Sequence, residues 1–283
     1  MDQSNGGNAD QIAYWNALAG ETWAELQERL DAQIQPLGAR AMAALAPRPG
    51  EWLLDIGCGC GQTTAALAEA VGPSGGVLGL DISRPMLAVA RRRLADAGAE
   101  NARLLEADAQ TERLEPNGFD AAFSRFGVMF FSDPRAAFAN VRSSLKSGGR
   151  LAFVCWRALF ENPWMLVPMA AALQHLPAPP PPLDPLAPGP FAFADPERVR
   201  AILTGAGFEG VEIAPHDQKI GTGDVDQATA LALKVGPLGA LLREQPDKQP
   251  LVVDAIRAAL GAHLTAEGVR MDSATWIVTA RAP

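Results

Sequence analysis

Three glycines alternate with small residues directly after a short apolar run, in the order Asp55, Gly57, Gly59 and Gly61. Glycine has no Cβ, so a loop built this way lets a ligand approach its backbone closely. The spacing does not match the pyrophosphate-binding pattern G-x-G-x-x-G, because no starting glycine leaves a glycine at the last position. A carboxylate before the first glycine suits a ligand that carries an ammonium group better than a diphosphate.

Two further carboxylates, Asp81 and Asp108, follow short apolar runs at residues 77–80 and 103–106. The carboxyl ends of parallel strands meet at one edge of a sheet, so we expect both acids to share a crevice with the glycine loop. Taken alone, Asp81 could equally cap the helix expected after it, and Asp108 could belong to a simple turn. Their combination with the glycine loop favours a ligand site.

The elements that must position these residues alternate along the chain. Short apolar runs are separated by amphipathic segments of helical period, which is typical of a parallel sheet covered on both faces. We expect an α/β fold, a doubly wound and mostly parallel sheet of seven strands. The expected strands cover 52–56, 77–80, 103–106, 119–123, 150–156, 211–213 and 275–280, and the expected helices cover 62–71, 86–97, 134–145, 164–176 and 196–203.

The segments outside this alternation are expected to cover the sheet edge. Residues 9–46 have helical periodicity, with one break at Gly20 and another at Pro36 and Gly38. The helix over 164–176 and the proline-rich stretch after it are expected to cross the crevice as a cover. Residues 224–262 read as mostly helical and punctuated by proline.

The motif Asp-x-Gly-x-Gly-x-Gly, with an acid after the second strand and another after the third, resembles class I S-adenosylmethionine-dependent methyltransferases. The resemblance is strongest over about residues 10–160, in the branch with ubiquinone/menaquinone-type and many natural-product small-molecule methyltransferases. It implies a Rossmann-like fold. It also implies S-adenosyl-L-methionine as the methyl donor and S-adenosyl-L-homocysteine as the product.

The resemblance implies a role for each matching residue. The backbone at the three glycines would pass beside the methionine moiety, and Asp55 would place its amino group directly or through water. Asp81 would accept hydrogen bonds from both ribose hydroxyls, and Ile82 would pack on the adenine face. Asp108 would accept from the adenine amine. The other residues expected at the cofactor are Ala109, Ser124 and Arg125 after the third and fourth strands, and Tyr14 and Trp23 on the N-terminal helices.

Methyl transfer from a sulfonium is an in-line displacement, so the protein mainly aligns the nucleophile and excludes water. A general base is needed only where the nucleophile keeps its proton. His175 is the candidate base, although a histidine at a helix end has a plainer interpretation in the helix dipole. The expected apolar acceptor pocket comprises Phe126, Met129, Trp156, Arg157, Trp164, Met165 and Met169.

No metal is expected, because Cys58 and Cys60 lie in a glycine loop and the three histidines are scattered. The three cysteines cannot form a disulfide framework, which indicates a reducing compartment. A net charge of −8 makes nucleic acid an unlikely partner. The N-terminus shows no secretory signal and no apolar run approaches the roughly 20 residues of a membrane span, so a cytoplasmic location is expected.

These expectations divide the chain into four segments. Residues 1–48 are N-terminal helices over the cofactor site, and 49–160 are the cofactor-binding α/β core. Residues 161–194 are the cap helix and proline-rich crossover, and 195–283 complete the core around a helical insertion at 224–262.

The function favoured by these residues is methyl transfer to the oxygen, nitrogen or carbon of a small, largely apolar molecule. An alternative within the same enzyme class is a peptide or protein acceptor, which an open acidic groove would support. An alternative of another class is an NAD-binding dehydrogenase or a silent nucleotide-binding module. The sequence leaves the oligomeric state open.

Overall fold

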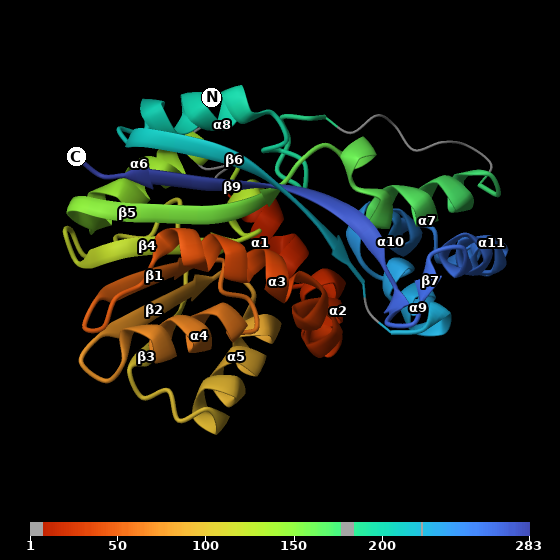
Figure 1. Ribbon diagram of the computed structural model, residues 1–283, viewed down its shortest axis with the longest axis horizontal. Coiled ribbons are helices and arrows are strands. Elements are labelled where there is room, and N and C mark those ends of the chain that lie inside the picture. Colours follow the sequence, from red (N-terminus) through yellow and green to blue (C-terminus); the bar gives the residue numbers. More distant parts are fainter. Residues whose placement is uncertain (1–7, 177–183, 222) are drawn as a thin grey trace.

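The computed structural model describes residues 8–176, 184–221 and 223–283, and its centre is a seven-stranded sheet (Figure 1). The strand order is β3-β2-β1-β4-β5-β9-β6, and only the pairings of β9 with β5 and β6 are antiparallel. The expected doubly wound, mostly parallel sheet is therefore confirmed. The strands are β1 Trp52–Ile56, β2 Gly76–Asp81, β3 Ala102–Glu106, β4 Phe119–Arg125, β5 Leu145–Trp156, β6 Glu209–Ile220 and β9 Met271–Arg281.

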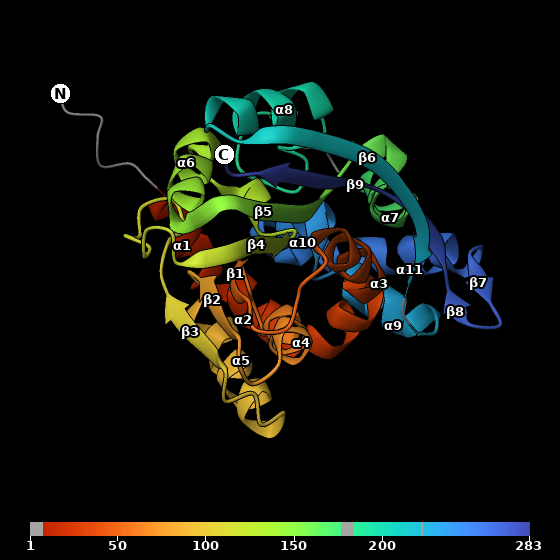
Figure 2. The same ribbon diagram turned by 60° about the vertical axis from the view of Figure 1, so that its left-hand side comes forward.

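Helices cover both faces of the sheet, which explains the continuous apolar runs of its central strands. Leu53, Leu54 and Phe123 are fully buried. Figure 2 shows α3, α4 and α5 against one face and α6 and α8 against the other. Their bounds are α3 Gln27–Leu45, α4 Gln62–Val71, α5 Arg84–Asp96, α6 Pro134–Ser144 and α8 Pro196–Gly205.

The breaks between the N-terminal helices differ from those expected. The helices are α1 Ala9–Trp15, α2 Leu18–Glu25 and α3, so Gly20 lies inside α2, and Pro36 and Gly38 lie inside α3. A Cβ on Gly20 would lie 1.9 Å from the Trp15 carbonyl oxygen, and one on Gly38 would lie 2.6 Å from Cδ of Arg125. Both glycines therefore permit close packing instead of ending a helix.

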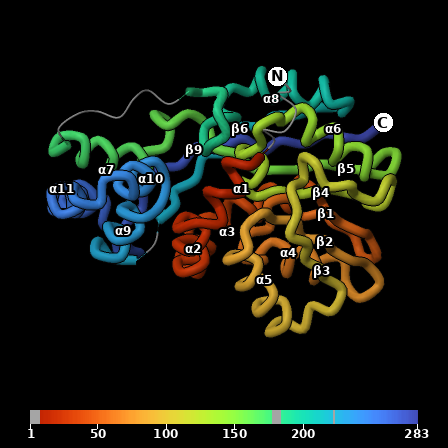
Figure 3. Tube along the Cα trace, turned by 180° about the vertical axis from the view of Figure 1, so that it is seen from behind, coloured from red at the N-terminus to blue at the C-terminus, as the bar shows by residue number. Residues whose placement is uncertain are grey.

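A group of helices lies beyond one end of β6 and β9 (Figures 1 and 3). It comprises α7 Pro163–Leu173, α9 Val225–Ala232, α10 Gly236–Glu244 and α11 Gln249–Gly261, and it has its own apolar cluster around Leu238, Val252 and Ile256. We call it the helical cap. The remaining elements are the short helices Val128–Phe130, Leu159–Glu161 and Pro246–Lys248, and the hairpin of β7 Leu264–Thr265 and β8 Gly268–Val269.

Only part of the expected cover over the crevice lies among the described residues. Helix α7 begins where predicted but ends at Leu173, three residues early. Residues 177–183 of the proline-rich crossover lie outside the described residues. Within the described part of the chain, no helix is long and apolar enough to cross a membrane.

Candidate functional site

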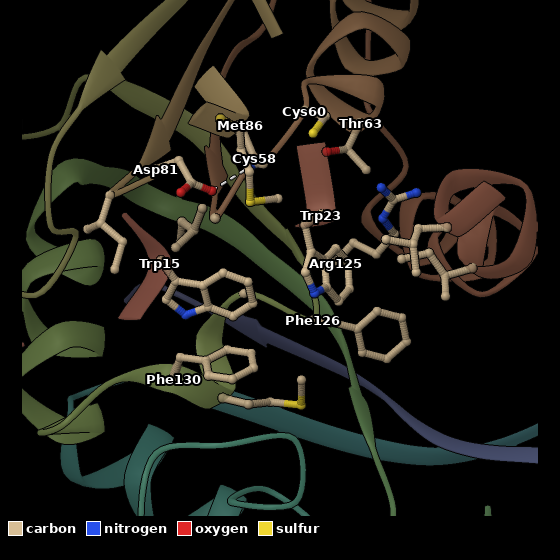
Figure 4. A pocket seen from close by; sticks show the side chains of 18 of the residues that line it. Trp15, Trp23, Cys58, Cys60, Thr63, Asp81, Met86, Arg125, Phe126 and Phe130 are labelled. Atoms are coloured by element: carbon tan, nitrogen blue, oxygen red, sulfur yellow. Dashed lines mark hydrogen bonds between the residues drawn. The ribbon is translucent and has the colours of Figure 1, made fainter. Parts of the chain in front are cut away.

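A cavity of about 170 Å³ lies where the carboxyl ends of β1, β2 and β4 meet (Figure 4). In-register pairing brings these ends together, because Ile56 lies opposite Leu80 and Asp55 opposite Phe123. Its walls also include residues of helices α1–α5 and α7, the end of β5 and the first residue of α10. The predicted site residues that line it are Gly57, Gly59, Asp81, Ile82, Asp108, Ala109, Arg125, Trp23, Phe126, Met129, Trp156, Trp164 and Met165.

The glycine loop has a backbone conformation that favours glycine at each of its three glycine positions. Gly57, Gly59 and Gly61 all have positive φ, at +67°, +54° and +80°. A Cβ on Gly57 would lie 2.8 Å from Cα of Gly127, so the loop and the segment after β4 touch backbone to backbone. Gly61 lies outside the cavity, and its missing Cβ makes room for Ala90 of α5.

Asp81 is joined directly to the glycine loop. One carboxylate oxygen accepts the Gly59 N–H at 2.7 Å, and the other accepts the Ser83 N–H at 2.8 Å. Burial raises the pKa of Asp81 to about 6 despite these two hydrogen bonds. The carboxylate is therefore fixed in orientation at the cavity wall, and lone pairs on both oxygens remain for a ligand.

Asp108 has a partner that the sequence did not indicate. Its Oδ1 accepts a hydrogen bond from the Asn8 side chain at 2.9 Å and another from the Gln110 N–H at 2.9 Å. The Asn8 oxygen accepts the Ser132 N–H at 2.9 Å. Asn8 is buried and lines the cavity, so it bridges the loops after β3 and β4 at this end of the site.

Asp55 lies beneath the glycine loop and does not line the cavity. Its fully buried carboxylate accepts hydrogen bonds from the hydroxyls of Thr63 and Thr64, both at 2.7 Å. Burial raises its pKa, and the two hydroxyls and Arg125 act in the opposite direction. Because Thr63 does line the cavity, Asp55 is connected to the cavity through that side chain.

A charged cluster of Asp31, Arg93 and Arg125 adjoins another part of the cavity, where Asp31 and Arg125 line the wall. Asp31 of α3 is 2.7 Å from Nη2 of Arg93 and 2.7 Å from Nη2 of Arg125. Gln27 and Gln62 accept further hydrogen bonds from Arg93 and Arg125 respectively. One buried carboxylate thus faces two guanidinium groups, and this part of the wall attracts an anionic group on a ligand.

Two groups of aromatic side chains flank the cavity. Phe126 stacks on Trp156 at 4.1 Å between ring centroids, and Trp164 lies 5.1 Å from Trp156. We call these three residues the aromatic wall. Phe126 has φ +60°, a strained conformation for a residue with a Cβ, which is often found at functional sites. Elsewhere, the Trp15 ring meets Trp23 at 5.9 Å and Phe130 at 5.2 Å, both edge to face.

Several residues predicted for the site lie away from the cavity. His175 is exposed beyond the end of α7. Tyr14 is 39% exposed and does not line the cavity, and Arg243 contacts both its hydroxyl and its ring. Ser124 is buried and donates to the Ile56 carbonyl oxygen at 2.8 Å. Arg157 pairs with Asp217 and Glu161 and lies over Trp276, and Met169 packs in the helical cap.

Cys58 and Cys60 line the cavity as neutral thiols. Burial raises the pKa of Cys60 to about 12 and raises that of Cys58 well above the ordinary value. Among the described residues, no three His, Cys, Asp or Glu side chains come together as metal ligands. The two thiols therefore act as small, uncharged parts of the wall.

The helices of residues 9–46 were expected over the site, but no residue of α3 was named in it. Leu30, Asp31 and Ile34 of this helix all line the cavity. A buried carboxylate among apolar positions of one helix face was the available signal, because such a charge needs partners. Other lining residues that were not predicted include Asn8, Thr63, Met86, Phe130, Phe131, Val235 and Gly236.

Comparison with known proteins matches the central part of this chain, which carries part of the cavity wall, to a described domain. Residues 53–149 match a family model described as a methyltransferase domain. Aklanonic acid methyltransferase DauC from Streptomyces sp. (strain C5) is 37% identical over 118 residues, 42% of this chain and 54% of that protein. Demethylmenaquinone methyltransferase from Staphylococcus aureus is 38% identical over 110 residues, 39% of this chain and 45% of that protein. The match thus spans about half the length of these curated relatives.

A solved structure extends the likeness beyond that domain. Phosphoethanolamine N-methyltransferase 2 from Haemonchus contortus, in complex with S-adenosyl-L-methionine, has a TM-score of 0.54 and 18% identity. The superposition covers 88% of this chain and 52% of that one. At this identity the likeness concerns the fold.

Proposed function

We propose that this chain, whose residues 53–149 match a methyltransferase domain, transfers the methyl group of S-adenosyl-L-methionine to a small, largely apolar organic molecule. The observation that carries the proposal is the Asp81 carboxylate, which faces the cavity and is fixed there by the Gly59 N–H. Two curated relatives are named for small organic acceptors, which supports an acceptor of that kind.

The residues around the cavity fit this cofactor. Gly57 and Gly59 line the cavity and have no side chain, so a ligand can approach their backbone closely. Asp81 accepts hydrogen bonds from the ribose hydroxyls, and Ile82 packs on the adenine face. Asp108 accepts from the adenine amine, and its orientation is set by Asn8. Arg125 holds the carboxylate of the methionine moiety.

The cofactor supplies a methyl group already activated by a positive sulfur, so the protein must align an acceptor and exclude water. None of the chain's three histidines, all within the described residues, lines the cavity. The titratable side chains that do line it are Asp31, Cys58, Cys60, Asp81, Asp108 and Arg125. Because their roles are in salt bridges, hydrogen bonds or neutral packing, the acceptor atom brings its own lone pair, as in a phenolate, an enolate or an amine.

The wall chemistry favours a small molecule over a peptide. The aromatic wall, Met129 and Met165 present an apolar surface, and the helical cap lies beside it. A peptide acceptor would need an open acidic groove, and the acids at this cavity are committed to the glycine loop, Asn8 and the arginines. A flat or branched apolar molecule fits such a surface.

Two experiments test the proposal. Calorimetry with S-adenosyl-L-homocysteine and with NADH is expected to give saturable binding of the former alone, and the reverse result would replace the proposal with a nicotinamide site. Incubation of a cell extract with the protein and methyl-labelled S-adenosyl-L-methionine is expected to place label in the solvent-extractable fraction. Label confined to precipitated protein would establish the peptide alternative.

A further inference from the structure

A second, smaller cavity of about 40 Å³ lies next to the cofactor cavity, inside the helical cap. Trp164, Met165 and Val235 line both cavities and form a partition between them. The walls of the second cavity come from α3, α7, α9, α10 and α11, from β8 and from the ends of β6 and β9. They are almost entirely apolar and include Ala228, Leu231, Leu238, Leu260, Val269 and Met271.

One polar side chain faces this apolar space. Gln33 of α3 is 5% exposed and lines the second cavity, but its amide makes no hydrogen bond with any described residue. Two other glutamines near the cofactor cavity contrast with it, because Gln27 and Gln62 both accept hydrogen bonds from arginines. Buried amides in folded proteins normally have partners, so an unpartnered one at a cavity wall points to a group that binds there.

The partition carries a second unpartnered polar group. The indole N–H of Trp164 is buried and has no acceptor among the described residues. A buried tryptophan usually finds an acceptor for this N–H. Met165 beside it is an unbranched, flexible side chain that repacks at low cost. The partition therefore consists of side chains that can rearrange around a bound molecule.

We propose that the second cavity is the distal half of the acceptor site and that Gln33 is a specificity-determining residue. The acceptor it fits has a methylated end against the aromatic wall, an apolar body that passes Trp164 and Met165, and a hydroxyl or carbonyl oxygen at its far end. The Gln33 amide can donate to or accept from that oxygen. This inference rests on the proposed function, which supplies the reaction at the near end.

The experiment uses three probes of increasing reach: phenol, 4-hexylphenol and 4-(6-hydroxyhexyl)phenol. Their dissociation constants are measured by calorimetry with and without saturating S-adenosyl-L-homocysteine. In the native protein, the hexyl chain is expected to tighten binding at least about tenfold, because each methylene that enters an apolar cavity contributes roughly a fourfold gain. The terminal hydroxyl is expected to add roughly a further fivefold.

Two variants, each with a matched control, locate the gains. Gln33→Leu is expected to abolish the gain from the terminal hydroxyl and to keep the gain from the chain. Ala228→Phe fills the cavity and is expected to abolish both. Gln35→Leu and Ala230→Phe make the same changes at exposed positions of the same two helices and are expected to leave all three constants unchanged. Circular dichroism verifies folding, and Gln33→Leu alone remains decisive if Ala228→Phe does not fold.

Three results would overturn the inference. The first would be that the hexyl chain gives no gain in affinity, or that none of the probes binds, in the native protein. The second would be that the gain from the chain survives in folded Ala228→Phe, which would place the chain elsewhere. The third would be that the gain from the hydroxyl survives in Gln33→Leu. A failure of the proposed function is seen separately, as absence of S-adenosyl-L-homocysteine binding, because the probes are also measured without it.

Discussion

Replacing Asp81 by asparagine is expected to weaken cofactor binding strongly while the fold remains intact. In the proposed site the carboxylate accepts two charge-assisted hydrogen bonds from the ribose hydroxyls, and bonds to a charged group contribute about 1.5–3 kcal/mol each. Their loss amounts to roughly 3–6 kcal/mol, or a factor of roughly 100 to 10,000 in affinity. Water and the remaining amide oxygen recover part of this, so the dissociation constant of S-adenosyl-L-homocysteine is expected to rise at least about 100-fold.

The stability of the Asp81→Asn variant provides an independent readout. The pKa of Asp81 is raised to about 6 by burial, which means that its charge opposes folding at neutral pH. Removing the charge is therefore favourable, but the single amide oxygen can serve only one of the Gly59 and Ser83 N–H groups. These effects oppose each other, and the Tm without ligand at pH 7.5 is expected to change by less than about 4 °C.

Glu106→Gln is the matched control for Asp81→Asn. Glu106 lies opposite Asp81 in the pairing of β2 with β3, but it is exposed and pairs with Arg84. Its loss is expected to change the dissociation constant by less than about twofold. Calorimetry on both variants decides the matter. Native affinity in Asp81→Asn, or an equal loss in Glu106→Gln, would refute the placement of the ribose.

Further predictions concern pH, the loop and the candidate base. The ionised Asp81 accepts hydrogen bonds, so affinity for S-adenosyl-L-homocysteine is expected to fall as pH drops through about 6, roughly tenfold between pH 7.5 and 5. A binding affinity that does not change with pH in calorimetry would contradict this expectation. The contribution of Asp81 to the stability of the fold has the opposite sign and is more favourable at low pH, because its pKa in the folded state lies above that in the unfolded state. Gly57→Ala is expected to eliminate measurable binding, since its Cβ would lie 2.8 Å from Gly127 Cα, and a native dissociation constant would show that the loop can yield. His175→Ala is expected to keep native turnover in a methyl-transfer assay, because His175 is exposed and outside the cavity; a tenfold fall would restore it as a base.

The convergence of Asp81, Asp108 and the glycine loop could be predicted because parallel strands deliver their carboxyl ends to one edge. No comparable rule connects distant helices to that edge. Asp31 reaches the cavity because α3 packs against β4 and β5 and meets Arg125 at the end of β4, a contact between residues 94 positions apart. Asn8 likewise reaches Asp108 across 100 positions. Such partners depend on packing that local periodicity does not encode.

The interpretation of glycine also shows where local reasoning fails. Gly57 was expected to let a ligand approach its backbone, and the neighbour that the structure shows at its vacant Cβ position is the backbone of Gly127. Gly20 and Gly38 were expected to break helices, but they are packing sites inside helices. A glycine in a helical pattern permits either outcome, and only the neighbour that fills the vacant Cβ position decides between them. Pro36 is accommodated within α3 because Ile34, Leu37 and Ala41 bury one face of that helix.

The bridge made by Asn8 has a practical consequence for purification. Asn8 is the first described residue, and trimming the chain past it would leave Asp108 and the Ser132 amide without their shared partner. An addition after Pro283 disturbs fewer contacts, because Pro283 is exposed. It follows Ala282, whose backbone hydrogen bonds with Gly148 and Gly149 are the last that the structure shows. An affinity tag therefore belongs after Pro283, and a protease that removes an N-terminal tag should cut well before Asn8.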